Sequence, residues 1–295
     1  MNKNLVKGFL CIAVTTLGFS TMEITGKMIS KDINPFQMTL IRFLIGGLFL
    51  LPFAVLEIRK RKLRLTPKDV LFFAAAGTIG IIISMSFFQS AVLYTKASVV
   101  AVIFSTNPIF TAPLAALFLG ERLTKGKILS LAVSVTGVLF IFNPFAVTPD
   151  ILGMLLALVA AISFSCYTVL SKKRVAKYGS LVLNSFSFLL GDAILLILML
   201  VIQKPVLSGI STANLPHLLY LGIFVTGIGY LCYFSAMKYT SAVTASTVFF
   251  IKPAVASVLS VILLGETIGV NTVIGILLII VSSYLLFRQN QKALQ

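Results

Sequence analysis

Four ionisable residues stand inside long apolar stretches of the sequence: Glu23, Arg42, Asp192 and Lys252. A charged side chain at the centre of a bilayer costs about 2.5–3.5 kcal/mol on insertion scales, so such residues normally face water, a partner or a ligand. Lys252 is the deepest, because it lies well inside the apolar stretch 243–264. Its ammonium group is a compact positive charge that suits an anionic ligand group. We therefore interpret Lys252 as a candidate binding residue.

Proline follows this lysine directly, and a second polar–proline pair lies at similar depth in another apolar stretch. Pro253 lacks a backbone N–H and tends to kink a helix, and so does Pro108, which follows Asn107. The carbonyl that loses its partner must find another donor or face a cavity. We expect Asn107 and Lys252 to flank a binding cavity, with Pro108 and Pro253 as hinges. The alternative for Lys252 is a structural ion pair, with Asp192 as a partner, or a neutral buried amine.

Glu23 allows two interpretations that its position does not separate. It can bind a ligand ammonium or exchange a coupling proton, or it can form an ion pair with Lys27 one turn later or with Arg42. For Arg42 we expect a structural or gating role. The aromatic residues Phe104, Phe249, Tyr167 and Tyr230 are candidates for the cavity wall, and helix packing is the alternative for each.

The composition requires a membrane environment for these residues. Of the 295 residues 58% are hydrophobic and 11% charged, and the mean hydropathy is +1.06, whereas soluble domains carry about 25% charged residues. A helix needs about 20 mostly apolar residues to cross a bilayer. Ten stretches meet this requirement, at residues 8–29, 35–56, 70–92, 98–119, 126–143, 151–170, 181–202, 215–237, 243–264 and 270–287. We predict an all-α integral membrane protein with ten transmembrane helices.

The net charge of +16 does not indicate nucleic-acid binding, because the basic residues are distributed by side. With a cytoplasmic N-terminus, most of the 24 lysines and arginines fall on the inner side, including the run at residues 59–68. This bias predicts a multi-pass protein of the cell membrane with both termini in the cytoplasm. The cysteines at positions 11, 166 and 232 lack metal-ligand spacing. We expect no metal, no cofactor and no catalytic residue.

The two halves of the chain resemble each other at a shift of 145 residues. Residues 90–121 read SAVLYTKASVVAVIFSTNPIFTAPLAALFLGE, and residues 235–266 read SAMKYTSAVTASTVFFIKPAVASVLSVILLGE. The same shift pairs Phe19 with Phe164, so we expect the first helix to be retained and not to be a signal peptide. Each half, 1–145 and 146–295, holds five predicted helices. An odd number places the halves in opposite orientations, which predicts inverted-topology repeats around a central cavity.

These repeats resemble the EamA-type family of the drug/metabolite transporter superfamily. The resemblance is carried by the segments from Pro108 to Leu119-Gly120-Glu121 and from Pro253 to Gly265-Glu266, and by Arg42-Phe43 in the second helix. Gly18-Phe19-Ser20 followed by Lys27 also matches, although the family's usual tryptophan is absent. The resemblance implies a ten-helix transporter whose cavity is lined by helices one, three, four, six, eight and nine. Helices five and ten would lie at the periphery.

The function expected from these features is secondary transport by alternating access. The substrate would be a small polar metabolite, such as an amino acid or a related carboxylate or zwitterion. By resemblance, export is the commoner direction. Protons are a candidate coupling ion. The sequence does not decide the oligomeric state, for which a homodimer is one option. The alternatives are a multidrug or other-metabolite exporter of the same fold and a non-transporting membrane scaffold. A membrane enzyme is disfavoured, because the single histidine, His217, has no accompanying catalytic motif.

Overall fold

The computed structural model describes residues 3–29, 31–94, 97–142, 150–264 and 269–292, without some of the side chains near the gaps. The described residues form helices and turns, and no strand. The helices of the first half are α1 (Lys3–Ile29), α2 (Pro35–Arg61), α3 (Pro67–Gly77), η1 (Thr78–Met85), α4 (Ser86–Tyr94), α5 (Ala97–Ser105), α6 (Asn107–Leu119) and α7 (Lys125–Phe142). The helices of the second half are α8 (Ile151–Val201), α9 (Leu215–Tyr220), η3 (Leu221–Ile228), α10 (Gly229–Tyr239), α11 (Ala242–Ser246), α12 (Val248–Leu264) and α13 (Val270–Lys292).

Several of these elements are parts of one long helical rod. The predicted stretch 70–92 corresponds to α3, η1 and α4, and 215–237 corresponds to α9, η3 and α10. The stretches 98–119 and 243–264 are interrupted by single residues, Thr106 and Thr247. By length and composition, eight helices of the described chain can cross a membrane. The chain is therefore a multi-span membrane protein, and the number of ten crossings stays a prediction.

The longest of the eight spans, α8, covers two of the predicted stretches. It has 51 residues and breaks at Gly179, whose φ of 79° lies in the left-handed region that glycine tolerates. A Cβ at this position would lie 2.5 Å from Glu57 Oε1 on α2. The predicted stretches 151–170 and 181–202 are thus the two arms of α8. The predicted stretch 126–143 corresponds to α7, which is not among the eight spans.

Pairs of helices from the two halves pack through small residues, and the contacts exchange under the 145-residue shift. Gly77 packs on Gly191, and Gly46 packs on Gly222, each with no room for a Cβ. Shifting 77 and 46 by 145 gives 222 and 191, so the first contact becomes the second. Small residues allow this close helix approach. The packing therefore follows the internal repeat.

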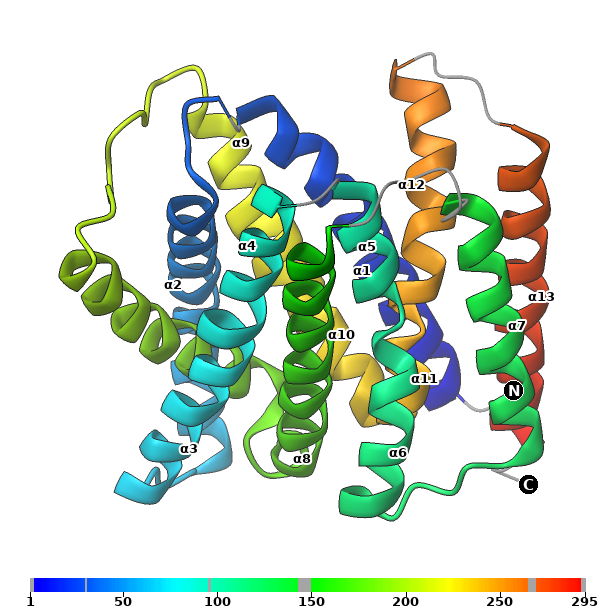
Figure 1. Ribbon diagram of the computed structural model, residues 1–295. Helices are drawn as coiled ribbons and strands as arrows, with labels where there is room; N and C mark the ends of the chain where they lie inside the picture. Colours follow the sequence, from blue (N-terminus) through cyan, green and yellow to red (C-terminus); the bar gives the residue numbers. More distant parts are fainter. Residues whose placement is uncertain (1–2, 30, 95–96, 143–149, 265–268, 293–295) are drawn as a thin grey trace.

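Helices α7 and α13 form a separate pair at one edge of the molecule (Figure 1). Gly137 packs on Gly275, and Ser130 bonds to Ser282. These two contacts also exchange under the shift. The pair is the fifth and the tenth predicted helix, in the peripheral position that the resemblance implies.

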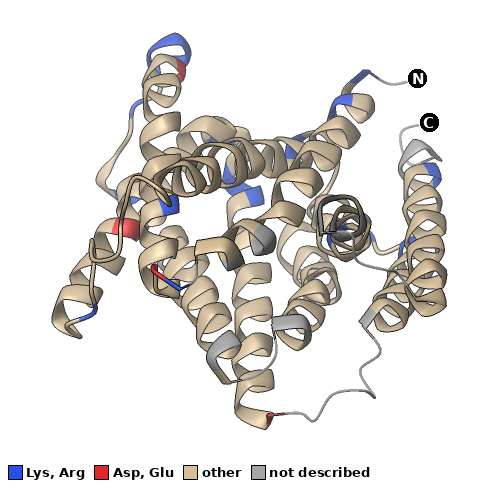
Figure 2. Cartoon of the chain, turned by 90° about the horizontal axis from the view of Figure 1, so that it is seen from above, with Lys and Arg blue, Asp and Glu red and all other residues tan. Residues whose placement is uncertain are grey.

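The two ends of the helical layer differ in what they carry. The turn between α2 and α3, the end of α6 and both chain termini lie toward the lower side of Figure 1. We call this the basic side, because the run at residues 59–68 lies there. Seen from above, the ribbon carries few charged positions (Figure 2). Helices of this composition suit a lipid environment.

Candidate functional site

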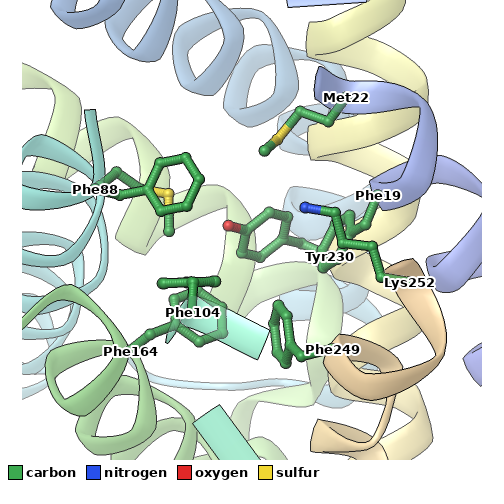
Figure 3. A pocket seen from close by; sticks show the side chains of 9 residues that line it. Phe19, Met22, Phe88, Phe104, Phe164, Tyr230, Phe249 and Lys252 are labelled. Carbon is green, nitrogen blue, oxygen red and sulfur yellow. The ribbon is translucent and has the colours of Figure 1, made fainter. Parts of the chain in front are cut away.

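A small cavity lies among helices of both halves (Figure 3). It is lined by six aromatic rings, two methionines and one amine: Phe19, Phe88, Phe104, Phe164, Tyr230, Phe249, Met22, Met85 and Lys252. The room left for water is about 20 Å³, which is enough for one molecule. A ligand of several heavy atoms therefore requires the walls to move apart.

The lining residues are related by the repeat. The shift of 145 pairs Phe19 on α1 with Phe164 on α8, Met85 at the end of η1 with Tyr230 on α10, and Phe104 on α5 with Phe249 on α12. The rings of Phe104 and Phe249 touch each other, with centroids 5.5 Å apart. The cavity therefore lies where the two halves meet, and equivalent positions from each half face each other across it.

The segments η1 and η3, at whose ends the Met85 and Tyr230 positions lie, are both π-helical. A π-helical segment is rare and occurs often at functional sites, because it widens the turn and redirects side chains. Met85 ends η1, and Tyr230 follows η3 by two residues. The same local irregularity in both halves thus positions two equivalent wall residues.

Lys252 supplies the amine of the cavity. Its side chain is 9% exposed, and its amine points into the same space as the Tyr230 hydroxyl (Figure 3). Ser20 Oγ on α1 donates a hydrogen bond to the Lys252 carbonyl at 3.2 Å. This bond fixes the backbone next to Pro253, which cannot donate itself. The sequence therefore places an amine in an aromatic cavity on a backbone held by a neighbouring helix.

Asn107 holds the equivalent position in the first half, but its amide is engaged in helix packing. Its Nδ2 donates to the Ala161 carbonyl at 2.9 Å and to Ser165 Oγ at 2.8 Å, and its Oδ1 accepts from Thr111. Ser165 Oγ also donates to the Asn107 carbonyl, which mirrors the bond from Ser20 to Lys252. In this conformation Asn107 ties α6 to α8 and does not line the cavity.

The two prolines also differ between the halves. Pro108 lies in the first turn of α6, directly after the interruption at Thr106. Pro253 lies inside α12, and the interruption in that half comes earlier, at Thr247. The equivalent helices thus break at non-equivalent residues. Two halves in different local conformations are what an asymmetric state of a repeat protein requires.

Arg42 is 2% exposed and lies behind the cavity wall. Its guanidinium contacts the sulfur atoms of Met22 at 3.1 Å and Met85 at 3.3 Å, and it stacks over the Phe43 ring at 4.6 Å. Met22 and Met85 line the cavity. Arg42 therefore supports the wall of the cavity, and its structural or gating role stays a prediction.

The remaining predicted site residues lie elsewhere. Tyr167 is buried against Phe164 and Phe234, outside the cavity lining. The side chain of Glu23 falls outside the described residues, so its two interpretations stay predictions. Neither oxygen of Asp192 has a hydrogen-bond partner among the described residues, so the Lys252–Asp192 pair is not formed. The described residues contain no cluster of three or more His, Cys, Asp or Glu that could hold a metal ion.

Five lining residues were not among the predicted site residues: Phe19, Phe164, Met22, Met85 and Phe88. The repeat relates each of them to another aromatic or candidate position. Phe19 and Phe164 pair under the shift, and Met85 is the shifted counterpart of Tyr230. Applying the shift to every candidate would have found Met85 and also Met22, which is the counterpart of Tyr167. Phe88 is the counterpart of Tyr233, which was not among the predicted site residues.

The cavity is closed toward the basic side by layers of contacts. The Tyr233 ring contacts Phe19, Phe164 and Phe249, and its hydroxyl bonds to Thr168 at 3.0 Å. Further out, Glu121 accepts from the backbone N–H of Ala242 at 2.7 Å. A path from the basic side into the cavity therefore requires these contacts to separate.

Comparison with known proteins explains this architecture. The model of the EamA-like transporter family matches residues 6–143 and again residues 151–288. The chain belongs to the EamA-like transporter family. An uncharacterized transporter of Clostridium kluyveri is 48% identical over 295 residues, with 97% of this chain and 95% of the relative covered. An uncharacterized transporter of Archaeoglobus fulgidus is 28% identical, with 95% of this chain and 98% of the relative covered.

A solved structure shares the fold. This crystal structure superposes on the present chain with a TM-score of 0.81 at 18% identity. The match covers 97% of this chain and 98% of the other chain. At this identity the likeness concerns the fold alone. The two matches of the EamA-like family model start 145 residues apart, which is the shift found in the sequence. Membership in the family makes the chain a membrane transporter, and the names of its relatives specify no substrate.

Proposed function

We propose that this EamA-like protein is a secondary transporter that moves a small organic carboxylate or zwitterion across the cell membrane by alternating access. The observation that carries the proposal is the cavity at the meeting point of the two halves, with Lys252 as its amine among aromatic walls. In this proposal the halves are inverted five-helix repeats, both termini are cytoplasmic, and export is the direction of transport. Exchange of conformation between such repeats opens the cavity to alternate sides.

The lining indicates the substrate class within this proposal. Aromatic rings and methionines offer apolar contacts and the ring faces that aromatic groups stack on. The amine of Lys252 offers a charge-assisted hydrogen bond to a carboxylate. A substrate that fits both features has an apolar or aromatic body and a carboxylate head. Phenylalanine is a suitable probe, and a highly hydrated metabolite is a poor one.

The conformational asymmetry supports the alternating-access mechanism. The described contacts close the cavity toward the basic side, and the interruptions at Thr106 and Thr247 are not equivalent. Contacts such as Gly77–Gly191 and Gly46–Gly222 exchange under the repeat. Two halves with equivalent packing and different local conformations can swap these conformations with little change in the contact surface.

Transport in proteoliposomes tests the proposal. We would compare labelled phenylalanine, phenylacetate, which lacks the ammonium group, and phenethylamine, which lacks the carboxylate. A hydrogen bond to a charged group contributes about 1.5–3 kcal/mol. Lys252→Met should therefore raise the half-saturating concentration for phenylalanine and phenylacetate about 10- to 150-fold. The control is Lys204→Met, on an exposed loop residue, which should change nothing.

Two outcomes would contradict the proposal. Absence of saturable phenylalanine and phenylacetate transport would remove the substrate class. An equal loss for phenylalanine and phenethylamine in Lys252→Met would show that Lys252 acts through the structure and not through the carboxylate. Lys252→Arg should keep part of the activity, because it keeps the charge in a larger head group.

A multidrug exporter of the same fold is the second candidate, and one observation favours it. Methionine-rich and aromatic surfaces adapt to many ligands, and Met22, Met85 and the rings make up most of this lining. This candidate predicts transport of several unrelated apolar compounds and unchanged transport in Lys252→Met. The same assay with labelled apolar cations therefore separates the two.

A further inference from the structure

A buried acid lies one helix turn from Phe188, whose ring contacts Tyr230 of the cavity wall, and it has no role in the proposed substrate contacts. Asp192 is on the second arm of α8 and is 2% exposed. Neither of its carboxyl oxygens has a hydrogen-bond partner in the part of the chain that the structure describes. Buried polar groups in proteins are normally paired, so an unpaired one requires an explanation.

The surroundings of Asp192 are partly polar. Asn184, Phe188 and Asp192 recur every four residues and therefore lie along one face of the helix. The side-chain oxygen and nitrogen of Asn184 are also buried without a partner in the described chain, and so is Ser187 Oγ. Unpaired buried groups in a polar environment are the usual sites of internal water. This stretch of α8 thus offers polar groups from its end on the basic side toward Asp192.

The face that carries Asp192 packs on α2. The Phe188 ring contacts Phe43 at 4.9 Å, and Ser185 Oγ bonds to the Gly47 carbonyl at 3.0 Å. The Arg42 guanidinium lies over the Phe43 ring at 4.6 Å, and Phe188 lies one turn before Asp192, so this contact brings the guanidinium and the Asp192 carboxyl to the same part of the α2–α8 interface. The same guanidinium contacts the sulfurs of Met22 and Met85, two residues of the cavity wall. Arg42 therefore lies between the acid and the cavity.

Other titratable groups of the described chain on the packed elements are engaged, uncharged or exposed. On α3, Asp69 is bound by Lys177 at 2.7 Å and by Tyr178. On α2, Glu57 pairs with Arg61 at 2.7 Å, near the basic side. On α10, Tyr230 and Tyr233 present phenol groups, and η1 has no titratable residue. In the described chain, Arg42 is thus the charged group placed to exchange contacts with Asp192.

We propose that Asp192 is a proton-binding site and that its ion pair with Arg42, formed when the proton leaves, couples proton movement to transport. A carboxylate buried without hydrogen bonds is strongly unfavourable, so the conformation described here suits the protonated acid. When the O–H bond of Asp192 breaks, the proton passes to water and the electron pair stays on the carboxylate. That carboxylate is a stronger partner for a guanidinium than a thioether sulfur is. Arg42 then leaves Met22 and Met85, and the wall is free to move.

The proton site itself can be tested without any substrate, by infrared spectroscopy on the purified full-length protein in liposomes. The wild-type difference spectrum between acidic and alkaline buffer should contain the carbonyl stretch of a buried carboxylic acid, shifted in D₂O. Asp192→Asn should lack this band, and Asp192→Glu should retain it at a displaced frequency. The control is Asp32→Asn, at an exposed position. Identical spectra for wild type and Asp192→Asn would overturn the proposal.

The coupling part rests on the proposed function and uses labelled phenylalanine as its probe. In Asp192→Asn the phenylalanine accumulation driven by a pH gradient should be at least tenfold lower than in wild type. Phenylalanine exchange between equal concentrations at equal pH should be unchanged. Loss of both activities in Asp192→Asn and in Asp192→Glu, or gradient-driven accumulation that persists in Asp192→Asn, would overturn the coupling. If wild type moves no phenylalanine, the substrate assignment fails, while the infrared result still decides the proton site.

Discussion

Removal of the Glu121 carboxylate should open the cavity toward the basic side. Glu121 follows α6, in the first half of the chain, and its oxygens accept from the backbone N–H groups of Ala242 at 2.7 Å and Val243 at 3.4 Å. These donors belong to the first turn of α11, in the second half, where a helix leaves N–H groups without internal partners. The contact therefore joins the two halves at the surface that must separate for opening. Glu121→Ala removes it.

The expected size of the effect follows from the two bonds. A hydrogen bond to a charged group contributes about 1.5–3 kcal/mol, and at 3.4 Å the second bond adds little. Glu121 is half-buried, so water replaces part of the lost interaction and the lower value applies. A loss of about 1.5 kcal/mol changes the ratio of open to closed molecules about tenfold.

Cysteine accessibility measures this ratio. Thr168, which bonds to Tyr233 beneath the cavity, is fully buried and would carry a single cysteine after replacement of Cys11, Cys166 and Cys232. A membrane-impermeant maleimide added from the basic side should label it about ten times faster in Glu121→Ala. The matched control is Arg122→Ala, at the exposed neighbour of Glu121. An unchanged rate in Glu121→Ala, or an equal rise in the control, would refute the gating role of this contact.

Two further predictions concern the packing between the halves, and thermal unfolding in detergent measures both. Asn107→Ala leaves the Ala161 carbonyl and Ser165 Oγ on α8 without the amide that donates to them, and should destabilise the protein by about 1–3 kcal/mol. An unchanged unfolding temperature would show that the amide is free to bind substrate. Gly77→Ala places a Cβ 2.2 Å from the Ser187 carbonyl oxygen and should cost about 1–3 kcal/mol through displaced helices. Gly269→Ala, whose Cβ would meet nothing within 4 Å, is the control, and an equal effect of both changes would contradict the close approach.

The membrane class and the repeat were predictable because each depends on many residues. Apolar runs of about 20 residues can be recognised without knowledge of their neighbours. The shift of 145 residues recurs in the family matches and in the helix contacts. Local breaks were not predictable in the same way. The π-helical form of η1 and η3 depends on a backbone hydrogen-bond pattern that the residue pattern does not specify.

The candidate site also has features that the sequence predicted and features that it could not predict. The sequence by itself determined that Lys252 lies at membrane depth. A charged residue inside a long apolar run, directly followed by proline, can be recognised without knowledge of the fold. It also determined that Asn107 is its counterpart in the other half. It could not determine which of the two faces the cavity, because equivalent positions in a repeat have equivalent local sequence. Only the tertiary structure decided that Asn107 is bound by Ala161 and Ser165 while Lys252 lines the cavity.

The roles of the other buried charges also depended on the tertiary structure. Composition marks Arg42 and Asp192 as costly residues, but it does not identify their neighbours. Arg42 lies behind the cavity wall against two methionine sulfurs, and Asp192 lies on the neighbouring helix without a hydrogen-bond partner in the described chain. The physical reason is that burial cost is a property of each residue, whereas pairing depends on which helices the fold brings together.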